Sequence, residues 1–298
     1  MRILLAPIVT LFISSQIPVI NTAFGTADII DEAPEDEALS ITVEQSDAIL
    51  DSGECYSTGE LVRPERVFVK TGSLTTFALV WLPEDWDSIP AEERRAIFHL
   101  HGHCGQGAMH FHTWQELAEE RGIAVIAPQV WLDGDAPPPG YNLHPDGGFH
   151  LDVYLDTYPM ITLLADEYGI SSILIHGFSM SACSAVILTY LDLTQADLID
   201  LTVVNAGHIS PTHPFRRAIV GSDDESVFEG ERFVFLLEDL PGRHGVYEGQ
   251  LNTRDWVESF GGEVLHTEVA ETGRHGVLLN SPSYAGLRED IVEIFTQY

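Results

Sequence analysis

One serine stands between an apolar, strand-like segment and an apolar, helix-like segment. Residues 172–176 run into Gly177-Phe178-Ser179-Met180-Ser181, and mostly small or apolar residues then continue to residue 191. A hydroxyl on such a sharp strand-to-helix turn is exposed, and small residues two positions before and after it let strand and helix approach closely. Gly177 meets this requirement, and Ser181 meets it only approximately because the usual pattern has glycine there. A serine here can also be a simple helix N-cap, but the flanking elements favour Ser179 as a nucleophile.

Two histidines share the same local sequence and compete for the role of general base. His244 and His275 each lie in the tetrapeptide Gly-Arg-His-Gly. His275 follows a predicted strand at 263–269, whereas His244 lies in the loop after the preceding strand at 232–237 and would crowd the acid expected there. We therefore expect His275 to accept the proton of the serine, and His244 is the alternative.

A carboxylate is needed to hold the tautomer of that histidine and to stabilise its imidazolium form. Glu238-Asp239-Leu240-Pro241-Gly242 follows the strand at 232–237. The chain order nucleophile, acid, base places the acid in this segment. We expect Asp239 to be the acid, with Glu238 as the competing choice.

A glycine-rich run, His101-Gly102-His103-Cys104-Gly105-Gln106-Gly107, follows another predicted strand at 96–100. Attack on an ester or amide carbonyl places negative charge on its oxygen, and preorganised backbone N–H groups stabilise that charge. We expect one donor to be the amide of Met180 and the other to be that of His103 or Cys104.

The same run allows a different chemistry. Alternation along a strand would place His99, His101 and His103 on one side, where they could bind a metal ion. This H-x-H-x-H pattern is similar to the first half of the metallo-β-lactamase loop H-x-H-x-D-H, but His103-Cys104 stands where that family has Asp-His. We expect no metal and no cofactor, and metal-dependent hydrolysis stays an alternative.

Charge excludes several classes of partner. The chain has 46 acidic and 14 basic residues among 298, for a formal charge of −32. Such a field repels nucleic acids and anionic membrane surfaces, which require clustered cations. We expect no nucleic-acid partner.

The N-terminal segment has the pattern of an export signal, with one arginine, an apolar run and small residues near residue 25. We expect residues 1–25 to be a signal peptide, residues 26–60 an acidic, poorly ordered leader and residues 61–298 the folded domain. The protein is then secreted or periplasmic, without stable membrane association after signal cleavage.

From residue 65 onward, short apolar strands alternate with helical stretches. This pattern predicts an α/β fold with a mostly parallel central sheet and helices on both faces, without a large cap domain. Residues 133–148 form a long loop rich in proline and glycine. A loop of this length suggests a functional rim, so we expect Trp131 and Tyr141 to line the substrate pocket.

The ordered motifs around His101, Ser179 and His275 resemble those of the α/β-hydrolase superfamily over about residues 60–298. Within it, the chain is similar to exported polyhydroxybutyrate-depolymerase-like and feruloyl-esterase-like enzymes. The resemblance implies a serine hydrolase that cleaves a small-molecule or oligomeric ester through a Ser-His-Asp triad and an acyl-enzyme. A peptidase and a noncatalytic binding protein remain open, because the fold does not fix the function.

Overall fold

Nine strands form one continuous sheet in the part of the chain that the structure describes. The computed structural model describes residues 26–30, 46–48, 51, 62–71, 74–102, 107–130, 151–220, 226–241 and 244–297. The strands are β1 (Ala27–Ile30), β2 (Glu65–Thr71), β3 (Leu74–Trp81), β4 (Arg95–Leu100), β5 (Ala124–Pro128), β6 (Ser172–Phe178), β7 (Ile199–Asn205), β8 (Arg232–Glu238) and β9 (Glu263–Ala270). Their order across the sheet is β1-β2-β3-β5-β4-β6-β7-β8-β9.

The sheet is antiparallel at one end and parallel over the rest. β1, β2, β3 and β5 pair antiparallel, whereas β5, β4, β6, β7, β8 and β9 pair parallel. The inner parallel strands β4, β5, β6, β7 and β8 are mainly buried and rich in apolar residues, as expected for strands covered on both faces. The edge strand β9 is half polar and mostly part-buried. The predicted α/β fold with a mostly parallel sheet is confirmed.

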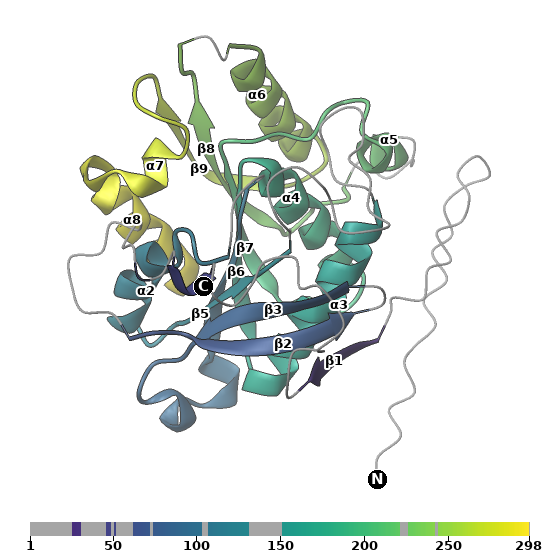
Figure 1. The fold of residues 1–298 in the computed structure, drawn as a ribbon. Helices are drawn as coiled ribbons and strands as arrows, with labels where there is room; N and C mark the ends of the chain where they lie inside the picture. Colours follow the sequence, from purple (N-terminus) through teal and green to yellow (C-terminus); the bar gives the residue numbers. More distant parts are fainter. Residues whose placement is uncertain are drawn as a thin grey trace.

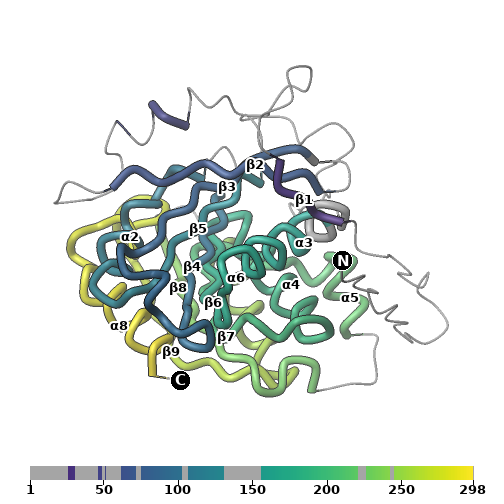
Figure 2. The backbone as a smooth tube through the Cα atoms, turned by 90° about the horizontal axis from the view of Figure 1, so that it is seen from below, coloured from purple at the N-terminus to yellow at the C-terminus, as the bar shows by residue number. Residues whose placement is uncertain are grey.

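Helices cover both faces of the sheet. They are α2 (Phe111–Glu119), α3 (Leu151–Tyr168), α4 (Met180–Leu193), α5 (Pro214–Val220), α6 (His244–Ser259), α7 (Val277–Asn280) and α8 (Ala285–Thr296), with 3₁₀ turns at Trp86–Ser88, Ala91–Glu93 and Pro282–Tyr284. Two views at right angles place α2 and α8 on one side of the sheet and α3, α4 and α6 on the other (Figures 1 and 2). Each group packs on its own apolar core. The result is a three-layer sandwich.

The N-terminal boundary differs from the expectation. Strand β1 falls within the segment expected to be a leader, and it pairs in register with β2 from Ala27↔Thr71 to Ile30↔Phe68. Asp47, from the same segment, forms ion pairs with Arg63 and Arg66. Parts of the expected leader therefore belong to the folded body, because the short apolar sequence of β1 pairs with β2 and its Ile29 packs against the core. Residues 1–25 lie outside the described residues.

The topology brings distant segments of the chain to one edge. Because β4, β6, β7, β8 and β9 run in the same direction, the segments that follow them meet at their carboxyl ends, where sites of such sheets are found. Among the described residues, no helix combines the length and the apolar character needed to cross a membrane.

Candidate active site

Ser179 lies at the junction of β6 and α4 in an unusual backbone conformation. Its φ is 56° and its ψ is −112°, a region that non-glycine residues rarely occupy. Although Ser179 occupies the N-cap position of α4, its side chain makes no capping hydrogen bond. The strained backbone directs the hydroxyl away from the helix end, as strain at functional sites commonly does.

Two glycines make room for this turn. A Cβ atom on Gly177 would overlap the carbonyl oxygen of Ser181, and one on Gly207 would overlap that of Ser179. The amide of Ser179 donates to the carbonyl of Asn205 over 2.7 Å. The segment after β7 is thus packed directly against the serine. Gly207 was not identified from the sequence, since its partner is 28 residues away and no local pattern marks it.

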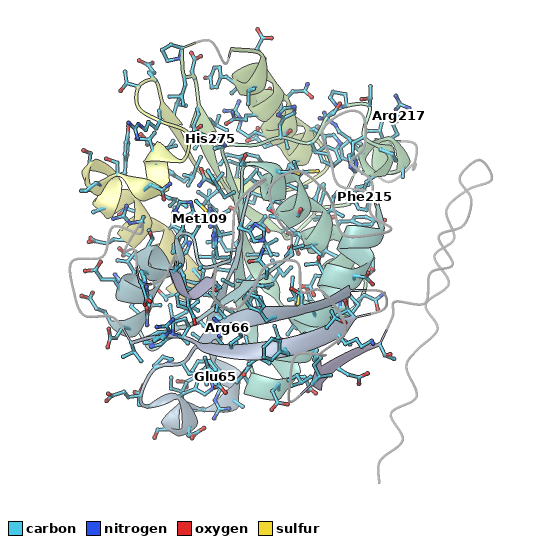
Figure 3. All side chains as sticks on the ribbon, viewed as in Figure 1. Glu65, Arg66, Met109, Phe215, Arg217 and His275 are labelled. Atoms are coloured by element: carbon cyan, nitrogen blue, oxygen red, sulfur yellow. The ribbon has the colours of Figure 1, made fainter. Side chains whose placement is uncertain are left out.

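A histidine from the far end of the chain meets the serine. Nε2 of His275 lies 2.8 Å from Oγ of Ser179, and Nδ1 of His275 lies 2.7 Å from Oε2 of Glu238. The backbone N–H of Gly276 donates to Oε1 of Glu238 over 2.5 Å. His275 belongs to the turn between β9 and α7 (Figure 3). A carboxylate accepts only, so Nδ1 carries a proton and Nε2 is free to accept the hydroxyl proton of Ser179.

The carboxylate beside the histidine is Glu238, which corrects the expectation of Asp239. Strand β8 continues through Glu238, one residue further than the sequence pattern indicated. Successive side chains of a strand point in opposite directions, so these two acids cannot both face His275. Glu238 is 2% exposed, whereas the backbone of Asp239 continues the pairing with β9 by donating to Ala270.

The other candidate base, His244, belongs to a different element. His244 is the first residue of α6, and its side chain lies outside the described residues. The ring hydrogen-bonded to Ser179 is that of His275. The choice of His275 over His244 stays a prediction, to which the described residues add the 2.8 Å distance between Nε2 of His275 and Oγ of Ser179.

Phe178 supports the imidazole, which the sequence did not reveal. Its ring centroid lies 4.9 Å from that of His275 and 5.3 Å from that of His110. A Cβ atom on Gly276 would lie 3.0 Å from the same ring. Phe178 thus forms an apolar wall that restricts the orientation of His275.

The expected oxyanion donors are described only in part. Met180 is the first residue of α4, where a backbone N–H has no acceptor within the helix. Gly102 packs against the serine, because a Cβ atom there would lie 3.0 Å from Cβ of Ser179. The expected donors His103 and Cys104, and the expected pocket residues Trp131 and Tyr141, lie outside the described residues.

Several histidines below the site form a buried polar cluster. Nδ1 of His176 accepts from Nε1 of Trp114 over 3.2 Å and lies 2.8 Å from Nδ1 of His99. Because the indole N–H can only donate, that nitrogen of His176 carries no proton and His99 is the donor. Burial holds the pKa values of His99 and His176 well below the usual range and lowers the pKa of His110 to about 4. These rings are therefore neutral at pH 7.

His99 and His101, two of the histidines that could bind a metal ion, have different hydrogen-bond partners. The His99 ring bonds His176, whereas the His101 ring bonds the backbone of Gly102 and Val130. His103 lies outside the described residues. Within the described ranges, no group of three or more His, Cys, Asp or Glu side chains is arranged to hold a metal ion.

Comparison with known proteins extends this picture at the level of the fold. No protein-family model matches the sequence, and no curated protein matches it. Among solved structures, a fungal esterase from Rhizomucor miehei is similar with a TM-score of 0.59 at 12% identity, over 89% of this chain and 92% of that one. A thermostable carboxylesterase cloned from a metagenomic library gives 0.58 at 14% identity, over 85% and 94%. A ferulic acid esterase gives 0.51 at 13% identity, over 74% and 93%. These similarities show that the chain has the α/β-hydrolase fold.

Proposed function

We propose that the protein is a serine hydrolase that cleaves carboxylic esters, with Ser179 as nucleophile, His275 as base and Glu238 as acid. One observation carries the proposal: an unbroken chain of hydrogen bonds joins a strained serine, an imidazole and a buried carboxylate. These three residues come from three separate segments of the sequence. Nucleophile, base and orienting group within hydrogen-bond reach are the signature of covalent acyl transfer.

The chemistry follows from the direction of these hydrogen bonds. Nε2 of His275 removes the proton as Oγ of Ser179 attacks the ester carbonyl, and the imidazolium is stabilised by Glu238. Collapse of the tetrahedral intermediate breaks the bond to the alcohol, which takes the proton from Nε2 and leaves an acyl-enzyme. Water, deprotonated by the same nitrogen, attacks the acyl carbon, and the carboxylic acid departs as the proton returns to Ser179.

Backbone amides stabilise the negative charge that develops on the carbonyl oxygen. The amide of Met180 is one donor, and the glycine-rich loop that begins beside Ser179 supplies the other, from His103 or Cys104. Loss of one such donor typically slows catalysis by about 10²- to 10³-fold.

Esters are the proposed substrates because the structural neighbours named above are esterases. Acyl and alcohol groups would be held by the rim that contains Trp131 and Tyr141. Peptide cleavage uses the same chemistry, so an amide belongs in any substrate panel.

We also propose that residues 1–25 direct export, which places the reaction in the periplasm or outside the cell. N-terminal sequencing of the protein from the culture medium or periplasm would test the cleavage.

The experiment is a panel of p-nitrophenyl esters of graded acyl length, together with a p-nitroanilide. Ser179→Ala and His275→Ala should each lower kcat by at least about 10⁴-fold, because removing either residue disables the whole unit. His244→Ala, in the second Gly-Arg-His-Gly segment, should retain activity close to that of the unchanged protein. EDTA should have no effect. Hydrolysis that survives Ser179→Ala but is abolished by EDTA would replace this proposal with metal-dependent hydrolysis.

A further inference from the structure

The turn that carries Ser179 is held from the neighbouring strand. Ser179 has a φ of 56° and a ψ of −112°, and such a backbone conformation persists only where the surrounding structure holds it. Its amide donates to the backbone carbonyl of Asn205, the last residue of β7, over 2.7 Å. Asn205 is also the partner of Phe178 in the ladder between β6 and β7. The position of the nucleophile therefore depends on what holds Asn205.

The side chain of Asn205 is fully buried and faces an imidazole of β6. Its Nδ2 lies 3.2 Å from Nε2 of His176, which is also fully buried. His176 precedes Gly177, the glycine that makes room for the turn. A buried donor or acceptor that has no matching partner destabilises the fold. The direction of this hydrogen bond therefore matters, and it can be worked out from the other contacts of His176.

Trp114 determines which nitrogen of His176 carries the proton. The indole N–H of Trp114, in α2, lies 3.2 Å from Nδ1 of His176 and can only donate. Nδ1 therefore carries no proton. Burial holds the pKa of His176 well below its usual value, so the ring is neutral at pH 7 and its single proton is on Nε2. That nitrogen is then the donor towards Asn205.

A donor at Nε2 of His176 requires an acceptor on Asn205. The oxygen and nitrogen of an amide are assigned from the hydrogen bonds that they make. With Nδ2 towards His176, two donors would face each other, and Oδ1 would be buried without a hydrogen-bond partner among the described residues. With the amide turned end for end, its oxygen accepts from Nε2. The contacts of His176 therefore require the second orientation.

We propose that Trp114, His176 and Asn205 form a directional chain of hydrogen bonds that positions the backbone of Ser179. The inference rests on the proposed function, because it gives that position a role in acyl transfer. The three are positioning residues. The indole fixes the tautomer of His176, the imidazole fixes the amide of Asn205, and the carbonyl of Asn205 holds the amide of Ser179. Misplacement of a catalytic group by about 1 Å can cost about 10²-fold in rate, so breaking this chain should slow the reaction although the triad side chains are unchanged.

The first measurement tests the direction of the chain and does not depend on activity. Long-range ¹H–¹⁵N spectra of the full-length protein labelled with ¹⁵N-histidine distinguish protonated from unprotonated ring nitrogens, and His176→Gln identifies the signals of His176 by removing them. We expect the proton on Nε2, with Nδ1 unprotonated, from about pH 6 to about pH 8. A proton on Nδ1, or a charged ring in this range, would overturn the proposal.

The second measurement tests whether the chain positions the nucleophile. Asn205→Leu removes the acceptor, whereas His176→Gln keeps an N–H near the position of Nε2 and an oxygen that can accept from the indole. Thr202→Val is the matched control. Thr202 is buried in β7, and its Oγ1 lies 2.6 Å from that of Thr189 in α4, so this variant loses a buried hydrogen bond of the same strand that does not involve the chain. Active sites are titrated with a fluorophosphonate, so that kcat for p-nitrophenyl butyrate refers to competent sites only, and urea unfolding gives the stability of each protein.

Asn205→Leu should lower kcat per titrated site by roughly 10- to 100-fold with KM nearly unchanged, and His176→Gln should lower it by less than about fivefold. Thr202→Val should lose stability but keep kcat per site within about twofold. The proposal is overturned if Asn205→Leu stays within about twofold of the unchanged protein, or if Thr202→Val loses as much. The NMR measurement decides the direction of the chain even if Asn205→Leu does not fold. An unchanged protein that neither reacts with the fluorophosphonate nor hydrolyses the ester would overturn the proposed function, and the role of the chain in acyl transfer with it, whatever the tautomer of His176.

Discussion

The tautomer of the His275 imidazole depends on the side chain that faces its Nδ1. Oε2 of Glu238 accepts from that nitrogen, while Oε1 is held by the backbone N–H of Gly276. The carboxylate thereby keeps the imidazole in the tautomer that can accept a proton from Ser179. The side chain of Asp239, the next residue along the chain, is directed to the opposite side of the strand, so the two acids can be compared directly.

Glu238→Gln should lower kcat by about 10⁴-fold, as an amide in place of the triad carboxylate does in serine proteases. The glutamine oxygen would stay with Gly276, so its NH₂ group would face Nδ1 and force the proton onto Nε2, where it blocks the serine. Asp239→Asn should lower kcat by less than about threefold. Steady-state kinetics on one p-nitrophenyl ester measures both changes. Equal losses in the two variants would show that the assignment of the acid is wrong.

At the scale of elements, the segment after β7 determines whether the nucleophile turn can form. Gly207 lies against the carbonyl of Ser179, and a methyl group at Gly207 would overlap that carbonyl oxygen. Asn205, at the end of β7, accepts the amide of Ser179. The turn is thus held by an adjacent strand as well as by its own sequence.

Gly207→Ala should abolish fluorophosphonate reactivity and destabilise the fold, because its methyl group overlaps backbone that cannot move independently of α4. Gly286→Ala is the control, since a Cβ atom at this position in α8 meets no atom within 4 Å. Alanine there should raise the free energy of unfolding by about 0.5–1 kcal/mol through better helix propensity. Urea denaturation and active-site titration measure both effects. A reactive, stable Gly207→Ala protein would contradict the described packing.

The elements also show how far the sequence could be interpreted. The alternation of apolar strands and helices predicted the parallel sheet, and the strand–turn–helix pattern predicted the position of Ser179. The predicted strands at 172–176, 199–204, 232–237 and 263–269 each ended one or two residues early. Their last residues, which include Asn205 and Glu238, are polar, small or isolated, so the apolar pattern ends before the backbone pairing does. At β8 the predicted strand ended at Leu237, one residue before Glu238, and the prediction named Asp239 as the acid.

Contacts between segments far apart in the chain could not be predicted in this way. The bond from Ser181 to His101 joins residues 80 apart, and Phe178 packs against His275 from nearly 100 residues away. Local patterns indicate which segments are strands and helices, but side-chain partners across the sheet follow from packing. The contact of Ser181 with His101 is therefore visible only in three dimensions.

At the scale of the whole molecule, the net charge of −32 opposes compaction. Screening shortens the Debye length from about 10 Å at 0.1 M salt to about 3 Å at 1 M. We expect the midpoint of thermal unfolding at pH 7 to rise by several degrees over this range of NaCl, with a smaller gain at pH 5, where fewer carboxylates are charged. Differential scanning calorimetry measures the shift. A midpoint that falls with added salt would contradict this balance.

The buried carboxyl of Glu231, which lies near other acidic residues, makes the free energy of unfolding depend on pH. Burial, followed by the nearby Asp197, Asp192 and Asp200, raises the pKa of Glu231 to about 8, and only 9% of the residue is exposed. A carboxyl with a raised pKa in the folded state favours folding below its unfolded pKa, near 4.5. That contribution is lost as pH rises towards 8, since the unfolded chain ionises first.

Glu231→Gln should therefore gain stability relative to the unchanged protein as pH rises, by up to about 4 kcal/mol between pH 5 and pH 8.5. Glu229→Gln, at an exposed position two residues away, should show no such trend. Urea unfolding across this pH range compares the three proteins. A difference for Glu231→Gln that stays constant with pH would show that Glu231 is ionised in the folded protein.

The central claim is that the hydroxyl of Ser179 is the reactive nucleophile. Incubation with a fluorophosphonate, followed by proteolysis and mass spectrometry, identifies the modified residue. We predict one adduct per chain, on the peptide that contains Ser179, and its loss in Ser179→Ala. An adduct on another residue, or labelling that persists in Ser179→Ala, would contradict the account.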